Sequence, residues 1–456
     1  MALPGSGTDI SLIDIDTEFS GPASPALTDF YRGGTYVPDT PTNSGVPTSG
    51  NISIRDFENA ADSVPLSISE ADYLLLDSNT FDRPINALRI GSNKAMFAIH
   101  DTGILTIKFV TQSSGTLSVS SAAVPTNDTG VSTENRINDF GFDPTTDHAL
   151  VAYRGGNGAI NTCSVECSGT APSIIDTDDS TVTELGTIET TAVCYLGAAG
   201  GGGSWFAVAY ILNVTGTRSL RLIAVELNSG GTIQATTPSI TLDAALSASE
   251  ADAALGMKIG CPASGKVVIP VQGGICHVAT FNFISETWTD NGEISGHESY
   301  IGSGCCTRSS KVAAFTDMPV ISANASPDDY SIKWVNSSGA FVTGSESTVD
   351  VTGGDGFPSA SFAKYANMAL GTMPDGTTRC LALAYRESSS TDTGFGIFKM
   401  DTNTSFEGTS AGIVKANTQS VFAYPVQMDD NYWLVVFRNG DSSNQNYGIL
   451  YNVTGG

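Results

Sequence analysis

The chain has 456 residues, and its 21 Lys and Arg against 47 Asp and Glu give a formal net charge of −26. A surface this acidic repels nucleic-acid phosphates and anionic lipid headgroups, so the sequence predicts no nucleic-acid partner. Short apolar runs recur throughout the chain, which excludes a fully disordered protein. None of these runs approaches the ~18 apolar residues of a membrane-spanning helix, so no membrane insertion is expected.

Residues 1–65 differ from the rest of the chain because they hold seven of its 19 prolines. Residues 6–15 and 49–57 each follow a small-residue turn with a short apolar and polar alternation, which predicts two short edge strands. Proline-rich sequence between such strands is typical of an extended arm. We therefore expect residues 1–65 to form an extended docking arm without a core of its own.

Residues 66–456 carry a repeated strand pattern in which small and branched residues precede an aromatic or aliphatic one. The repeats lie at residues 95–99, 149–153, 206–210, 267–271, 311–315, 381–385 and 434–437. Their mean spacing of about 56 residues is close to the length of a propeller blade with long loops. The sequence predicts an all-β fold, a seven-bladed β-propeller over 66–456, with tandem β-sandwiches as the alternative.

The two ends of this region predict how the ring closes. The last strand pair ends near Val453, which leaves no residues for an outer strand, and residues 71–77 precede the first blade without a partner. Pairing between these segments would remove both exposed sheet edges.

Polar residues recur directly after the second strand of the predicted blades. Five of these positions are candidate binding residues: His100, Arg154, Gln272, Arg386 and Arg438. The loops that they begin open on one face of a propeller, where guanidinium groups hold carboxylates or acidic sugars in a bidentate manner. The alternative is that each Arg solvates a strand end or pairs with a neighbouring acidic loop.

The sequence contains no convincing motif for catalysis, cofactor binding or metal binding. Residues 260–266 imitate a phosphate-binding loop, but position 267 is Val instead of Ser or Thr and the sequence continues as a strand. Cys163 and Cys167 would lie ~13 Å apart along a strand, too far to share one zinc ion. The eight dispersed cysteines are expected to be mostly free thiols. A glycosidase pair of carboxylates can be neither identified nor dismissed in so acidic a chain.

Residues 27–38 and 46–57 carry a resemblance to a known family. The second stretch contains Ser49-Gly50-Asn51-Ile52-Ser53-Ile54-Arg55-Asp56-Phe57. This resembles a short N-terminal module of structural proteins of tailed bacteriophages, although Glu58, Asn59 and Ala60 replace its usual glycine-containing finish. The resemblance covers about 60 residues and implies an arm that docks on another virion protein. The candidate docking residues are Phe30, Tyr31, Arg32, Ile52, Ile54 and Phe57.

These observations together predict a phage virion protein, made in the host cytoplasm and located in the virion. The expected type is a tail-fibre or adhesin subunit whose arm binds tail, neck or capsid and whose propeller attaches to a host surface glycan or protein. A homo-oligomer or many copies per particle is expected. The alternatives are a capsid-decoration or head-fibre protein with a purely structural role, and a propeller glycan hydrolase or lyase. No enzyme activity and no cofactor are predicted, with glycan depolymerisation left open.

Overall fold

The structure is a computed structural model. It describes residues 3, 10–22, 24–37, 43–57, 67–78, 84–101, 104–126, 138–155, 159–182, 184, 186–246, 257–271, 275–295, 304–305, 318–323, 329–342, 347–350, 367–376, 378–386, 392–400, 412–439 and 445–455. Within strands, the side chains of residues 84–86, 100–101, 138, 180, 304–305, 318, 321–323, 329–331, 347–350, 385–386, 392–393 and 412–422 lie outside this description.

Antiparallel sheets in chain order form the first five blades. Blade 1 contains β2 (Pro84–Gly91), β3 (Lys94–Asp101), β4 (Ile104–Ser113) and β5 (Thr116–Val119). Blade 2 contains β6 (Asn138–Asp143), β7 (His148–Arg154), β8 (Ile160–Glu166) and β9 (Ser173–Val182). Blade 3 contains β10 (Thr187–Ala198), β11 (Ser204–Val214), β12 (Thr217–Leu227), β13 (Ile233–Thr236) and β14 (Ile240–Leu246). Blade 4 contains β15 (Gly260–Ala263), β16 (Lys266–Val271), β17 (Ile275–Asn282) and β18 (Thr287–Ile294), and blade 5 contains β19 (Gly304–Cys305), β20 (Met318–Ala323), β21 (Asp329–Val335) and β22 (Ser347–Asp350).

One long strand joins the last two blades. Blade 6 contains β23 (Asn367–Thr372), β24 (Arg379–Arg386) and β25 (Asp392–Lys399), and blade 7 contains β27 (Tyr432–Asn439) and β28 (Asn446–Thr454). The first half of β26 (Gly412–Gln427) pairs with β25 as an outer strand, and its second half pairs with β27 as an inner strand. The chain therefore passes from blade 6 to blade 7 within the single strand β26.

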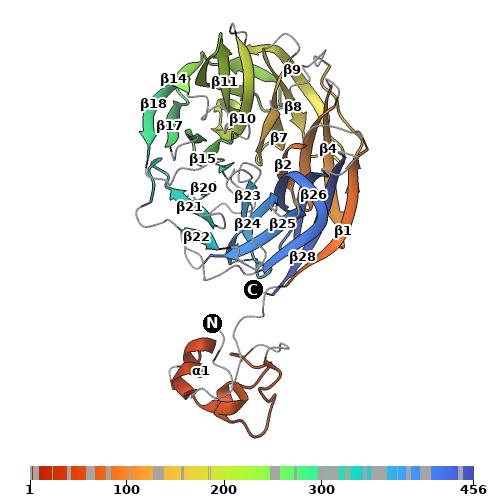
Figure 1. Ribbon diagram of the computed structural model, residues 1–456, viewed down its shortest axis with the longest axis vertical. Coiled ribbons are helices and arrows are strands. Elements are labelled where there is room, and N and C mark those ends of the chain that lie inside the picture. Colours follow the sequence, from red (N-terminus) through yellow and green to blue (C-terminus); the bar gives the residue numbers. More distant parts are fainter. Residues whose placement is uncertain are drawn as a thin grey trace.

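The seven blades form a closed ring, as Figure 1 shows. Successive blades contact one another through their first two strands, and β2 of blade 1 contacts β26 of blade 7. The predicted seven-bladed propeller is confirmed. The alternative prediction of tandem β-sandwiches is wrong. One detail differs: the second strand of blade 5 is β20, whereas the repeat predicted at residues 311–315 lies outside the described residues.

The predicted ring closure is also confirmed. Strand β1 (Ser67–Asp77) pairs antiparallel with β28 and becomes the outer strand of blade 7. The rings of Tyr73 and Tyr447 stack across this pair with centroids 5.0 Å apart. Because β1 precedes blade 1 in the chain, the closing strand joins the two ends of the propeller.

The hydrophobic core consists of layers between neighbouring blades. In β11, Phe206 and Val208 belong to the cluster shared with blade 2, whereas Ala207 and Ala209 belong to the cluster shared with blade 4. Successive side chains of a strand point to opposite faces, so a central blade strand needs apolar residues at every position. This requirement explains the unbroken apolar runs that made the repeats visible in the sequence.

Residues before the propeller form a small module instead of an extended arm. They contain α1 (Leu12–Phe19) and the 3₁₀ turns η1 (Leu27–Asp29) and η3 (Ile54–Phe57), so the two predicted edge strands are wrong. Seven buried side chains make a core of its own: Leu3, Ile15, Phe19, Phe30, Val37, Val46 and Phe57. The prediction that this region has no core is wrong, because aromatic rings supply enough apolar surface despite the prolines. The rings of Phe30 and Phe57, for example, pack edge to face with centroids 6.4 Å apart.

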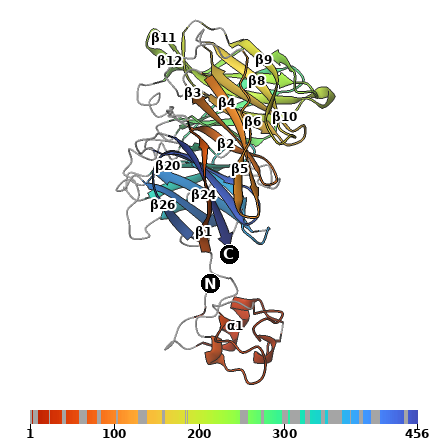
Figure 2. The same cartoon turned by 90° about the vertical axis from the view of Figure 1, so that its right-hand side faces the viewer.

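The module lies apart from the propeller sheets in both Figure 1 and Figure 2. No helix in the described part of the chain has the length and apolar character needed to cross a membrane.

Candidate functional site

The candidate binding positions lie at the same end of equivalent strands. Arg154 and Arg386 are the last residues of β7 and β24, while His100 and Arg438 are the last but one of β3 and β27. These are the second strands of blades 2, 6, 1 and 7, so the four backbones reach one face of the ring. Gln272 and the side chains of His100 and Arg386 lie outside the described residues.

The two described arginines are half-buried. The Nε atom of Arg154 is shielded from solvent and makes no hydrogen bond within the described residues. Burying a guanidinium nitrogen without a partner costs free energy. A ligand with oxygen acceptors that reaches Arg154 would recover that cost.

A buried amide that sequence reasoning missed lies beside one of them. Asn446 begins β28 directly opposite Arg438 of β27, so both side chains point to the same side of the blade. Asn446 is fully buried, and neither its amide oxygen nor its amide nitrogen has a hydrogen-bond partner in the described part of the chain. The register thus places a fully buried amide, unsatisfied within the described residues, beside Arg438 in the interior of the blade. Only the pairing register reveals that Asn446 lies beside Arg438. In the sequence, Asn446 is simply a polar residue that follows a loop.

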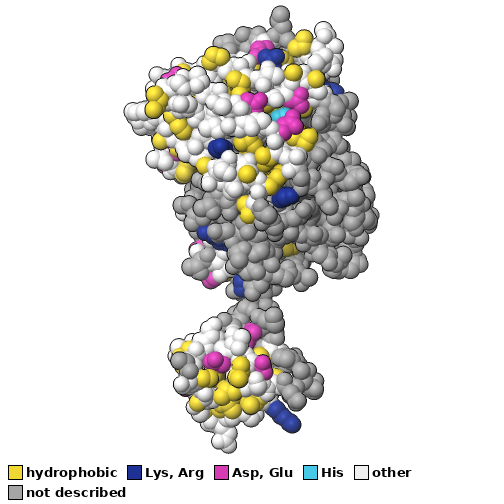
Figure 3. Space-filling view, turned by 90° about the vertical axis from the view of Figure 1, so that its left-hand side faces the viewer, with side chains coloured by type: hydrophobic (Ala, Val, Ile, Leu, Met, Phe, Trp, Pro, Cys, Tyr) yellow, Lys and Arg dark blue, Asp and Glu magenta, His cyan; other side chains and the backbone are white. Residues whose placement is uncertain are grey.

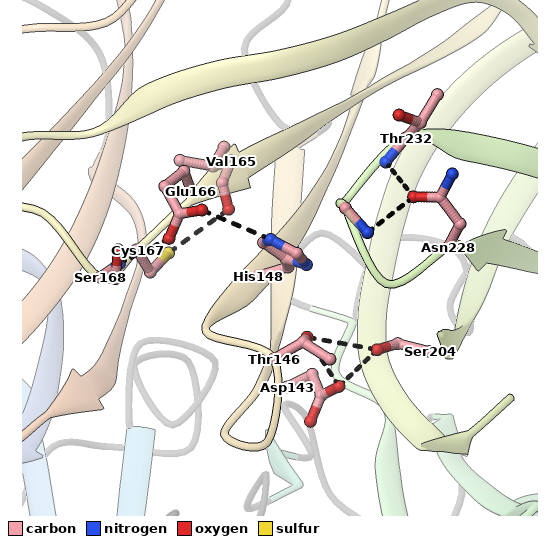
Figure 4. Close-up of polar contacts among 11 residues, drawn as sticks. Asp143, Thr146, His148, Val165, Glu166, Cys167, Ser168, Ser204, Asn228 and Thr232 are labelled. Carbon is pink, nitrogen blue, oxygen red and sulfur yellow. Dashed lines mark hydrogen bonds and ion pairs between the residues drawn. The ribbon is translucent and has the colours of Figure 1, made fainter. Parts of the chain in front are cut away.

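A second polar cluster lies at the opposite ends of the strands, between blades 2 and 3. Asp143, at the end of β6, accepts hydrogen bonds from the Thr145 backbone and from the hydroxyls of Thr146 and Ser204. Figure 4 shows His148 directed toward Glu166 and away from Ser204, and its Nε2 lies 3.5 Å from Glu166 Oε2. Since no described histidine contacts Ser204, the hydrogen bond from Ser204 to Asp143 is structural and fastens the β6–β7 turn to blade 3.

Tyr195 belongs to the same cluster and has a perturbed phenol. Burial and the nearby Asp143 carboxylate raise the pKa of Tyr195 to about 12. The phenol stays protonated at neutral pH and donates to Asp143, which agrees with a structural role for the cluster.

One group of described side chains has the spacing of metal ligands. Asp243 of β14, His277 of β17 and Glu293 of β18 hold one ligand atom each within 4.8 Å of one another. Figure 3 faces the flank of the propeller on which these strands lie and shows a histidine among acidic side chains. No local sequence pattern marks these three residues, because they come from two blades.

The predicted docking residues are distributed between the core and the surface of the module. Phe30 and Phe57 are fully buried, so they hold the module together and are not exposed to a partner, which corrects their predicted role. Ile52 and Ile54 are half-buried and pack against the same core. The hydroxyl of Tyr31 donates to the Gly50 carbonyl, and Arg32 forms a parallel bridge with Val37.

No family model matches this chain, and no curated protein matches it. It is similar to a solved protein from Lactobacillus plantarum, at 9% identity over 73% of this chain and 88% of that one, with a TM-score of 0.42. It is also similar to a protein of unknown function from Dyadobacter fermentans, at 12% identity over 85% and 99% of the chains, with a TM-score of 0.44. A functionally unknown protein from Desulfotomaculum acetoxidans is similar at 10% identity over 78% and 95%, with a TM-score of 0.44.

Proposed function

We propose that this chain is a structural protein of a bacteriophage virion, of the tail-fibre or adhesin type. The N-terminal module attaches it to the particle, and the propeller carries the face that attaches to the host. The observation that supports this most directly is that the segment resembling virion modules has its own core, separate from the propeller layers.

Separate cores fit a protein whose two parts bind different partners. The core of the module contains Phe19, Phe30 and Phe57, and each aromatic ring lies within about 6.5 Å of the others. A module stabilised in this way keeps its shape when the propeller is engaged elsewhere. The attachment surface is then its exposed side, which includes Ile13, 74% exposed on α1.

The propeller's contribution to this function is binding without turnover. The strand ends carry the half-buried guanidinium groups of Arg154 and Arg438, and guanidinium donors are the chemistry that carboxylate-bearing glycans require. The net charge of −26 opposes adhesion to phosphate-rich surfaces, so a glycan or a protein is the better receptor class.

Electron microscopy of particles with and without residues 1–57 tests the proposal. Loss of density from the tail or baseplate is the expected result, together with slower adsorption to host cells. Loss of density from the head would instead identify a decoration protein, and unchanged particles would overturn the attachment role of the module. Release of reducing sugar from host envelope material by the purified chain would replace the adhesin with an enzyme.

Substitution on the propeller face separates receptor binding from attachment to the particle. The triple variant Arg154→Ala, Arg386→Ala and Arg438→Ala should reduce binding of the purified protein to host cells at least tenfold. Lys266→Ala is the matched control, because Lys266 begins β16 at the opposite end of the second strand. Equal binding by both variants would remove the strand-end positions from the receptor site.

A further inference from the structure

We propose that Asp243, His277 and Glu293 form a binding site for a divalent transition-metal ion, of the Zn²⁺ type, that fastens blade 3 to blade 4. The site joins the last strand of blade 3 to the third and fourth strands of blade 4, whereas Arg154, Arg386 and Arg438 lie in blades 2, 6 and 7. Its test therefore does not use the arginines of the proposed receptor site.

The backbone brings the three residues together from two blades. His277 and Glu293 face each other across the β17–β18 pair, so their side chains lie on the same side of blade 4. His277 is two residues before Ala279, which belongs to the core layer shared with blade 3, so the imidazole also points toward blade 3. There it meets Asp243 on β14, a strand that contacts β18.

The separations suit ligands of one ion better than a direct contact. Nε2 of His277 lies 4.0 Å from Oδ2 of Asp243, too far for a hydrogen bond. Two ligands of a tetrahedral Zn²⁺ ion that each lie about 2.1 Å from the metal are roughly 3.4 Å apart, so a small movement of the carboxylate toward the ring would bring both atoms to ligand distance. The other oxygen of Asp243 accepts a 2.8 Å hydrogen bond from the Ala245 backbone, which orients the carboxylate with Oδ2 toward the histidine. Glu293 is exposed, so its side chain can adjust to complete the set.

The histidine itself points to a missing ligand. His277 is only 1% exposed, its buried Nδ1 has no hydrogen-bond partner among the described residues, and its Nε2 faces Asp243 at 4.0 Å. A buried imidazole normally uses at least one nitrogen, since an unused polar atom costs about 1–3 kcal/mol. A metal ion bound at Nε2, the nitrogen that faces Asp243, would give this buried ring a polar interaction, although Nδ1 would keep no described partner.

The donor set indicates the class of ion. One imidazole nitrogen and two carboxylate oxygens are ligands that Zn²⁺ accepts, whereas Ca²⁺ and Mg²⁺ prefer oxygen ligands alone. Three protein ligands leave one position of a tetrahedral site for water, which the exposed side of Glu293 makes accessible. Because Asp243 comes from blade 3 and the other two ligands come from blade 4, binding would resist separation of these blades.

The experiment uses the full-length, untagged protein after treatment with EDTA and gel filtration. Calorimetric titration with ZnCl₂ should show one equivalent bound, and Zn²⁺ should raise the melting temperature. Asp243→Asn and Glu293→Gln should each weaken Zn²⁺ binding about tenfold or more and abolish the thermal shift. Both replacements are nearly isosteric. Asp243 is partly buried and Glu293 is exposed, so both variants should fold.

The pair His148 and Glu166 provides the matched control. It is a second buried histidine beside a half-exposed glutamate, but no described third ligand joins it. Glu166→Gln should therefore bind Zn²⁺ like the wild type. The proposal is overturned if the wild type binds no Zn²⁺, if Asp243→Asn and Glu293→Gln bind it as tightly as the wild type does, or if Ca²⁺ binds with equal affinity.

Discussion

Lys108 of β4 binds Asp77 at the end of β1, with 2.5 Å between Nζ and Oδ2. The two residues belong to different blades, since β4 lies in blade 1 and β1 is the outer strand of blade 7. Lys108 also donates to the Leu76 carbonyl at 3.3 Å. The closing strand is thus held by β28 on one side and by a charged contact from the first blade on the other.

Removal of this lysine should destabilise the ring closure. The side chains of Lys108 and Asp77 are only 17% and 6% exposed, so the pair is largely shielded from water. Lys108→Met should lower the free energy of unfolding by about 2 kcal/mol, because it withdraws the ammonium from a buried carboxylate. Denaturant unfolding measures this change. The double variant Lys108→Met and Asp77→Asn should recover part of the loss, and additive effects of the two substitutions would contradict the coupling.

Truncation should distinguish the module from the closing strand. A chain that begins at residue 66 keeps β1 and should melt at the same temperature as the full chain. A chain that begins at residue 78 lacks β1, exposes the edge of β28 and loses the burial of Leu76 and Leu74 against the blade 7 and blade 1 layer. That burial contributes about 2–4 kcal/mol. Light scattering should show a monomer for the first chain and aggregates for the second, and identical behaviour would refute the role of β1.

The number of blades could be predicted from the sequence because each central strand is buried on both faces and therefore appears as a dense apolar run. The fifth blade shows the limit of this signal, since its second strand, Met318–Ala323, follows the apolar run at residues 311–315 and does not coincide with it. The closing strand could be predicted because it was the strand-like segment left without a partner.

The module was predicted wrongly because its prolines outweighed a helix signal that was present. Ser11 and Asp14 form a capping box, and the Asp56 carboxylate accepts a hydrogen bond from the Ser53 backbone in the same spacing. Serine followed three residues later by an acid is typical of a helical start. The cluster at Asp243 and His277 had no such local signal, because only the packing of blade 3 on blade 4 brings the two residues together.

Gln427 should be the most sensitive polar residue of the blade 6 and blade 7 junction. Its Oε1 accepts a hydrogen bond from the Thr372 backbone N–H at 3.0 Å, and its Nε2 donates to the Thr372 carbonyl at 2.7 Å. Gln427→Ala would remove both contacts in a buried site and should lower the free energy of unfolding by about 2–3 kcal/mol. The exposed Gln234 provides the control, and Gln234→Ala should change stability by less than about 0.5 kcal/mol. Equal effects of the two substitutions in chemical denaturation would show that the Gln427 contacts contribute little.

The helix of the N-terminal module should lose stability in acid through one carboxylate. The pKa of Asp14 is lowered because the Ser11 hydroxyl and then the Ser11 backbone N–H donate hydrogen bonds to the ionised carboxylate. A group whose pKa is lower in the folded state stabilises the fold above its unfolded pKa, and this contribution disappears as the pH falls through the folded pKa. Hydrogen exchange of residues 11–20, corrected for its intrinsic pH dependence, should therefore accelerate in acid more in the wild type than in Asp14→Asn. The effect should be modest and weaker at high salt, because Asp14 is exposed. A wild type and an Asp14→Asn variant with the same pH dependence would show that the capping carboxylate does not stabilise α1.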